Sequence, residues 1–197
     1  MPKKINSKGL ELPTTSELEL ALSQEKYKYS YKKLLISTIN VLIIVSAISV
    51  LIATLLFPVL KIYGKSMAPT LTEGDIVVSI KDPNLERGDV IAFYYNNQIL
   101  VKRVIATSSQ WVNIDKAGNV FVNDELLSET YIKEKAYGEN DITYPYQVPE
   151  DSYFVLGDQR ATSVDSRNLS IGAVSKEDII GKVIFKVWPL SNLSIVT

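Results

Sequence analysis

Residues 34–57 read LLISTINVLIIVSAISVLIATLLF, and this stretch decides how the rest of the chain is organised. It contains no charged side chain and would be apolar on every face of a helix. With a rise of about 1.5 Å per residue, such a helix is about 36 Å long and can cross the ~30 Å hydrocarbon layer of a bilayer. Cleavable signal peptides have only about 7 to 15 apolar residues, so the stretch predicts a retained transmembrane signal anchor.

The charges before this stretch predict its orientation. A single nearby glutamate, Glu25, is outnumbered by four lysines on the N-terminal flank: Lys26, Lys28, Lys32 and Lys33. The positive-inside rule therefore places the N-terminus in the cytosol. The chain is expected to be a single-pass protein of the cell membrane, with the lipid bilayer as a partner.

Three parts follow from this division. Residues 1–33 form a cytosolic tail, which we expect to be mobile because its apolar periodicity is weak. Residues 34–57 form the transmembrane signal-anchor helix, and residues 58–197 form one compact extracytoplasmic domain.

Composition narrows the chemistry of that outer domain. The 197 residues include no His and no Cys, which excludes a Ser-His-Asp triad, a cysteine nucleophile and zinc sites built from imidazole or thiolate. A net charge of −1 gives no reason to expect nucleic acid as a partner. Ser or Thr activated by Lys, or paired carboxylates that activate water, remain as catalytic options beside a non-catalytic role.

The outer domain is predicted to be mostly β. Short runs rich in β-branched and aromatic residues recur between turn residues, at 75–80, 89–95, 98–106, 111–115, 120–122, 152–156 and 179–188. Asn96-Asn97 separates two of these runs and is typical of a hairpin turn. The residues alone therefore predict a single β-rich domain.

Two segments contain candidate catalytic residues. Ser66 lies in the turn-rich segment GKSMAPTL at 64–71, just after the membrane stretch, although most serines only solvate turns. Lys102 and Arg103 interrupt an apolar strand pattern, and strand alternation sends them to opposite faces. A desolvated lysine can be neutral and act as a base, whereas an arginine stays charged and needs a carboxylate partner.

A third segment, GDQRATSVDSR at 157–167, is dense in charge. Asp158, Arg160, Asp165 and Arg167 could form a buried ion network, or they could lie in a solvated loop. The number of charges by itself favours the solvated loop.

Together these segments resemble the type I signal peptidase family, in its small, Gram-positive-like bacterial form. Ser66-Met67-x-Pro69-Thr70-Leu71 resembles the nucleophile motif, Lys102-Arg103-Val104 the base motif, and the segment from Gly157 to Arg167 the last motif. The resemblance covers about residues 34–188. It implies a membrane-anchored domain of the signal peptidase and repressor-protease fold, which cleaves N-terminal signal peptides from exported preproteins without a metal or other cofactor.

The resemblance also implies roles for individual residues. Ser66 is the expected nucleophile of a Ser/Lys dyad, Lys102 its general base, and Ser163 the residue whose hydroxyl orients the lysine amine. A supporting network is expected from Arg103, Asp158, Arg160, Asp165 and Arg167. The residues expected to border the sites for small substrate side chains, unless they are simply core, are Ile62, Met67, Leu71, Ala92 and Val101.

Some positions depart from the family pattern and leave other interpretations open. Gly64 stands where some relatives have a serine that adds a second oxyanion donor, and Gln159 stands where Asn is usual. Such changes allow a specialised enzyme for pilin or other surface-protein export. The alternatives are a non-catalytic assembly factor for surface proteins with a peptidase fold, and a self-cleaving regulator of the repressor type.

Overall fold

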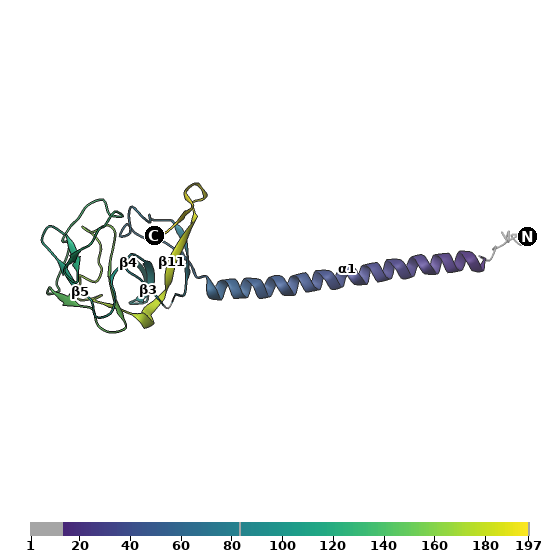
Figure 1. The fold of residues 1–197 in the computed structure, drawn as a ribbon. Helices are drawn as coiled ribbons and strands as arrows, with labels where there is room; N and C mark the ends of the chain where they lie inside the picture. The colour runs from purple at the N-terminus through teal and green to yellow at the C-terminus, as the bar shows by residue number, and fades with distance from the viewer. Residues whose placement is uncertain (1–13, 83, 197) are drawn as a thin grey trace, which may run out of the picture. The chain divides into compact units, whose positions relative to one another are not determined.

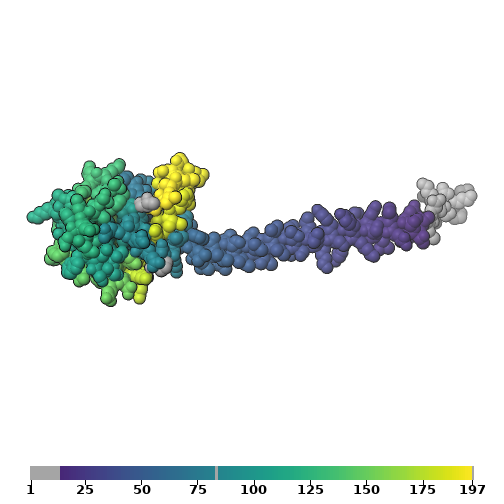
Figure 2. Space-filling view, viewed as in Figure 1, coloured from purple at the N-terminus to yellow at the C-terminus, as the bar shows by residue number. Residues whose placement is uncertain are grey.

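The computed structural model describes residues 14–82 and 84–196, and it begins with one long helix, α1 (Thr15–Leu56). α1 has 42 residues, none of them buried, and it is long and apolar enough to cross a membrane. The space-filling view shows its side chains uncovered along its length (Figure 2). A long apolar helix whose side chains are not buried in the protein is typical of a segment that packs against lipid.

The helix begins much earlier than expected. Residues 15–33 of the predicted tail belong to α1, and residues 1–13 lie outside the described residues. The mobility of the tail stays a prediction. Thr14 caps the start, because its N–H donates to the Glu17 carboxylate and its hydroxyl accepts from the Glu17 N–H. No Pro or Gly follows until Pro58, so nothing in the sequence ends the helix at the membrane boundary.

The remaining chain forms a β-rich domain, as predicted (Figure 1). Its strands are β1 (Val59–Lys61), β2 (Ile76–Ile80), β3 (Val90–Tyr95), β4 (Gln98–Ala106), β5 (Trp111–Ile114), β6 (Val120–Val122), β7 (Glu125–Leu126), β8 (Tyr146–Gln147), β9 (Ser152–Leu156), β10 (Val174–Ser175), β11 (Ile179–Trp188) and β12 (Ser194–Ile195). Short 3₁₀ helices span Lys176–Asp178 and Leu190–Asn192. Each of the seven predicted runs contains a strand.

The strands form two antiparallel sheets. The larger has the order β1-β2-β11-β3-β4-β9-β10, with β12 added to β11, and the smaller has the order β7-β6-β5-β8. The hairpin between β3 and β4 turns at Asn96 and Asn97, whose φ angles of 44° and 64° are those of a tight hairpin turn. In Figure 2 the yellow C-terminal hairpin of β11 and β12 stands out from the domain.

Strand alternation sorts the apolar residues of β3 and β4 into separate cores. Ile91 and Val104 belong to one cluster with β9, and Ala92 packs in another with residues after β1. A third cluster joins the ends of β4 and β9 to the small sheet. The first two clusters pack on opposite faces of β3 and β4. β4, which lies between β3 and β9 in the sheet, is the strand that contains Lys102 and Arg103.

Candidate active site

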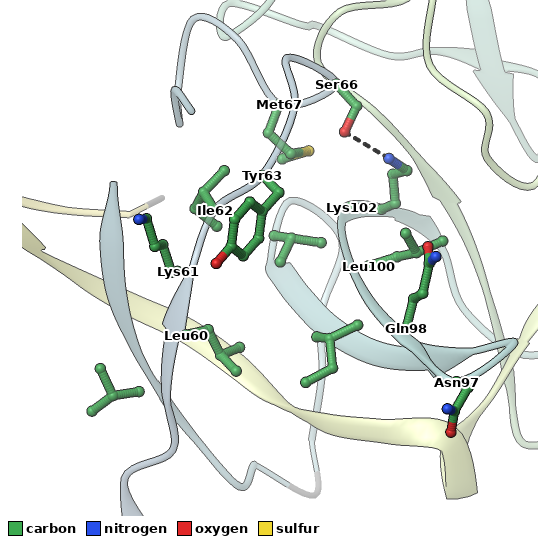
Figure 3. A pocket seen from close by; sticks show the side chains of 13 residues that line it. Leu60, Lys61, Ile62, Tyr63, Ser66, Met67, Asn97, Gln98, Leu100 and Lys102 are labelled. Carbon is green, nitrogen blue, oxygen red and sulfur yellow. Dashed lines mark hydrogen bonds between the residues drawn. The ribbon is translucent and has the colours of Figure 1, made fainter. Parts of the chain in front are cut away.

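Ser66 and Lys102 meet at the end of a cleft in the β-rich domain. Lys102 lies in β4, and Ser66 lies in the turn that follows β1. The Lys102 Nζ donates a hydrogen bond of 2.7 Å to the Ser66 Oγ (Figure 3). The two residues are 36 positions apart in sequence, so only the fold brings them together.

Burial controls the charge of the Lys102 amine. The residue is only 3% exposed, and loss of hydration lowers its pKa from the ordinary 10.5 to about 8. Asp165 raises that pKa through space, Arg167 lowers it and Asp158 raises it, but these charges do not reverse the effect of burial. Lys102 forms no ion pair within residues 14–82 and 84–196. A neutral amine is therefore accessible near pH 8.

The segment after β9 fixes the backbone of Ser66. The Gln159 N–H donates to the Ser66 carbonyl oxygen over 3.0 Å. Gly157 passes so close that a Cβ there would lie 2.6 Å from the same oxygen, and only a glycine can occupy that position. The Ser66 N–H, in contrast, has no acceptor among the described hydrogen bonds. It is thus available to an oxygen of a substrate.

Ser163 does not make the expected contact with Lys102. Its hydroxyl is buried and has no hydrogen-bond partner in the part of the chain that the structure describes. The Ser163 N–H donates to the Gln159 carbonyl, which holds the residue in a tight turn, and its Oγ lies against Gly157. The expected hydrogen bond between Ser163 and Lys102 is therefore not among the described contacts.

The charged residues of the last motif are buried, so the solvated loop favoured by charge counting is wrong. Arg103 donates from Nε and Nη2 to the two carboxylate oxygens of Asp158, both over 2.9 Å. Arg167 makes the same two-pronged contact with Asp165, over 2.8 and 2.9 Å. These side chains are at most 1% exposed. Such bidentate pairing is what allows permanent charges to be buried.

Sequence reasoning missed two members of this network. Arg160 pairs with Glu129, whose side chain is fully buried, and not with an acid of its own segment. Tyr131 donates its hydroxyl to Glu129 and places its ring 4.1 Å from the Arg103 guanidinium carbon. Glu129 and Tyr131 lie in irregular chain after β7, where no periodic pattern marks them. A signal available in the sequence was that the two motifs contain three arginines, Arg103, Arg160 and Arg167, but only two acids, Asp158 and Asp165.

A cleft of about 730 Å³ leads to the dyad. Its walls are the segment from Val59 to Tyr63, with Met67, and the β4 residues from Gln98 to Lys102 (Figure 3). Most of the lining side chains are apolar, with the Ser66 hydroxyl and the Lys102 amine at one end. This arrangement suits an extended peptide with small apolar side chains.

The five predicted substrate-binding residues fall into two groups. Ile62, Met67 and Val101 line the cleft. Leu71 and Ala92 do not, because both are fully buried in the core cluster behind it. Residues that line the cleft but were not predicted include Leu60, Tyr63 and Gln98. The alternation of Leu60 and Ile62 after the membrane stretch is the signal that could have revealed β1.

One edge of β4 faces the cleft without a strand partner. β4 pairs with β3 from Gln98 to Arg103, but with β9 only from Arg103 onward. The backbone of residues 98–102 is therefore free on one side to pair with a bound peptide. Among the described residues, no group of three His, Cys, Asp or Glu side chains is placed to hold a metal ion.

The chain is similar to known proteins along most of its length. The family model for signal peptidase, peptidase S26, matches residues 35–188. Signal peptidase I of Bacillus amyloliquefaciens is 31% identical over 87% of this chain and 98% of its own length. Signal peptidase IB of Staphylococcus aureus (strain COL) is 36% identical over 66% of this chain and 78% of its own length.

In two further comparisons the match covers only about half of one of the two chains. Thylakoidal processing peptidase 1 of Arabidopsis thaliana is 32% identical over 75% of this chain and 46% of its own length. A crystal structure of a signal peptidase I from Enterococcus faecalis V583 has 31% identity and a TM-score of 0.43, and the match covers 50% of this chain and 96% of that one. The family model and the Bacillus relative are sufficient: the chain belongs to the signal peptidases of peptidase family S26, as the resemblance in its motifs predicted.

Proposed function

We propose that this serine peptidase removes signal peptides from exported preproteins with Ser66 as nucleophile and Lys102 as general base. The observation that carries the proposal is the 2.7 Å hydrogen bond between a serine hydroxyl and a lysine amine whose pKa burial lowers to about 8. An amine that is neutral near the working pH can accept a proton, which is the main requirement for a general base.

Acylation follows from this contact once the amine is neutral. The Ser66 hydroxyl then donates to the Lys102 Nζ, the reverse of the direction in the charged form. Ser66 Oγ attacks the carbonyl carbon of the scissile bond while Nζ takes its proton. The ammonium returns that proton to the leaving amine, the C–N bond breaks, and the signal peptide remains as an ester on Ser66.

Deacylation uses the same lysine. Lys102, neutral again, takes a proton from water, and the resulting hydroxide attacks the ester carbon. The C–O bond to Ser66 breaks, the Lys102 ammonium returns the proton to Ser66 Oγ, and the signal peptide is released. The oxyanion of both steps is met by the unpartnered Ser66 N–H. We propose Ser163 as a positioning residue, because its buried and unpartnered hydroxyl is available to accept a hydrogen bond from the amine when Lys102 no longer donates to Ser66.

Substrate binding is proposed to use the free edge of β4. An extended signal peptide that pairs with residues 98–102 would present alternate side chains to the cleft. Ile62, Met67 and Val101 would limit the side chains before the cleavage point to small apolar ones. With Leu71 and Ala92 buried behind it, the cleft has no deeper pocket at that place.

The membrane helix supports the proposed location. The lysines that precede the apolar stretch favour a cytosolic N-terminus and an extracytoplasmic catalytic domain. A tether to the bilayer then raises the local concentration of enzyme relative to signal peptides, which are themselves apolar and membrane-bound. A narrower dedication to pilin or other surface proteins stays a prediction.

The test is cleavage of a preprotein in liposomes by the full-length chain and by Ser66→Ala. Removal of the hydroxyl leaves no nucleophile, and we expect turnover to fall by at least about 10³-fold. Unchanged circular dichroism and thermal unfolding would show that the fold is retained. Turnover within tenfold of wild type in Ser66→Ala would contradict the proposal and favour a different nucleophile. A non-catalytic assembly factor would bind surface proteins without cleaving them in either form.

A further inference from the structure

A second pocket, of about 360 Å³, meets the cleft at the dyad. The two share Ser66 and Lys102, together with Gln98 and Leu100 of β4. The other walls of the second pocket come from different segments: Gly64 and Lys65 before the nucleophile, Tyr95 at the end of β3, and Thr162, Val164 and Ile171 beyond β9. The cleft and the second pocket therefore meet at Ser66 and Lys102.

A peptide that is cut at Ser66 must continue on both sides of the dyad. If the cleft holds the residues before the scissile bond, the residues after it must leave along another path past Ser66 and Lys102. Of the described pockets, the one bordered by Gly64 and Val164 alone shares both dyad residues with the cleft. We propose that this leaving-side pocket binds the first residues of the mature protein, and that Lys65 favours an acidic side chain there.

The charge around the leaving-side pocket supports this preference. Lys65 is exposed, and it forms no ion pair within residues 14–82 and 84–196. No Asp or Glu lines the pocket, and its other lysine, Lys102, is neutral in the proposed active form. The first mature residues therefore meet an unopposed positive charge at a solvent-exposed wall. An exposed ion pair between Lys65 and an acidic substrate side chain would change substrate binding by about two- to fivefold.

The inference rests on the proposed function, and its test uses the full-length enzyme in zwitterionic detergent. Three preprotein-derived peptides share one sequence up to the cleavage point and have Glu, Gln or Lys at the second position after it. We expect kcat/KM to fall in that order, by about two- to fivefold per step. Lys65→Gln should abolish the difference between peptides, and Lys65→Glu should reverse it.

Matched substitutions separate a local effect from a general one. Lys116→Gln removes the same charge from the exposed hairpin between β5 and β6 and should leave the order unchanged. Lys61→Gln removes a charge from the cleft, on the acyl side. If Lys61→Gln and not Lys65→Gln abolished the preference, the assignment of the two pockets would be reversed and the inference overturned. Salt at 1 M should also suppress the preference, because it screens charges beyond about 3 Å.

The outcomes also distinguish this inference from the proposed function. If Ser66→Ala is inactive while Lys65→Gln retains the wild-type order of the three peptides, the dyad stands and the leaving-side assignment is wrong. If Ser66→Ala cleaves the peptides as wild type does, the dyad itself is wrong. Equal kcat/KM for all three peptides in wild type would overturn the role of Lys65 directly.

Discussion

Lys102 and Arg103 are neighbours on β4, yet the regions around them treat a buried positive charge in opposite ways. Arg103 reaches both oxygens of Asp158, donates to the Gly88 carbonyl and lies against the Tyr131 ring. In the described part of the chain, Lys102 donates only to the neutral hydroxyl of Ser66. One side of the strand thus gives its cation a carboxylate partner in direct contact, and the other side gives its cation only a neutral hydroxyl.

The presence or absence of a carboxylate partner distinguishes a cation that supports the fold, such as Arg103, from one that is suited to act as a base, such as Lys102. A guanidinium cannot lose its proton at working pH, so it can be buried only when a carboxylate balances it. A lysine amine without such a partner responds to burial by a fall in pKa and becomes a usable base. Lys186 shows the contrast within one residue type: it is also buried, but its amine lies 3.4 Å from Asp75.

The largest effect is expected from Lys102→Arg, which keeps the charge and removes the ability to be neutral. We expect kcat/KM for preprotein cleavage to fall by about 10²–10⁴-fold, the usual contribution of a general base. Lys186→Arg is the matched control, because a buried lysine that faces Asp75 needs only its charge. Equal losses in the two variants would mean that Lys102 acts through packing and not as a base.

Removal of a carboxylate from the paired region should affect stability. Asp165→Ala leaves the Arg167 guanidinium buried without its bidentate partner and also removes the acceptor of the Gly157 N–H. We expect a loss of about 3–5 kcal/mol in the free energy of unfolding, measured by denaturant titration in detergent. Glu125→Ala, at an exposed site on β7, should change it by less than about 0.5 kcal/mol. A loss below 1 kcal/mol for Asp165→Ala would mean that the pair is not a support of the fold.

The lowered pKa of the Lys102 amine predicts the pH dependence of cleavage. Because Lys102 must be neutral and its pKa is lowered to about 8, kcat/KM should rise with pH and level off above about 8. Two pH units below that midpoint, about 1% of the amine is neutral, so the rate at pH 6 should be about 100-fold below the plateau. A profile that is flat from pH 6 to 9 would show that the proton of Ser66 goes elsewhere.

The smallest effect is expected at the aromatic cover of Arg103. Tyr131→Leu removes the ring that lies over the guanidinium and should lower the free energy of unfolding by about 0.5–2 kcal/mol. Tyr131→Phe keeps the ring, loses the hydroxyl that donates to Glu129, and should show what the ring alone contributes. Thermal unfolding of both variants beside wild type measures the two parts. Equal stability of Tyr131→Leu and Tyr131→Phe would indicate that the ring contributes nothing.

Local patterns predicted the longer strands, and they failed where partners are distant. The Ser66–Lys102 dyad was expected from the resemblance in the motifs and stays a proposal. The run from Gln98 to Ala106 became β4 as expected, because its β-branched residues alternate between two cores. β8 and β10 have two residues each, too few for a period to be read. The resemblance assigned Ala92 to the pocket, and its strand pattern could not test this, because an apolar side chain in a strand has the same pattern whether it lines a cleft or a core.

The same limit applies to charges. Counting residues from Gly157 to Arg167 favoured a solvated loop, since nothing local shows that Arg103 and Glu129 arrive from other segments. The early start of α1 has a different explanation. Residues 15–33 contain good helix formers without a breaker, and the weak apolar periodicity that suggested a mobile tail is what an uncovered helix shows.

The amino-acid order alone determined that this chain has an apolar stretch able to span a bilayer, a β-rich domain after it, and neither imidazole nor thiol for its chemistry. Those properties depend on composition and on periods of a few residues. The tertiary structure decided that Arg103 has a carboxylate partner and Lys102 has none among the described residues. It also decided which edge of β4 lacks a strand partner and that two pockets meet at Ser66. Such properties depend on desolvation and on contacts between segments tens of residues apart, and no local pattern records them.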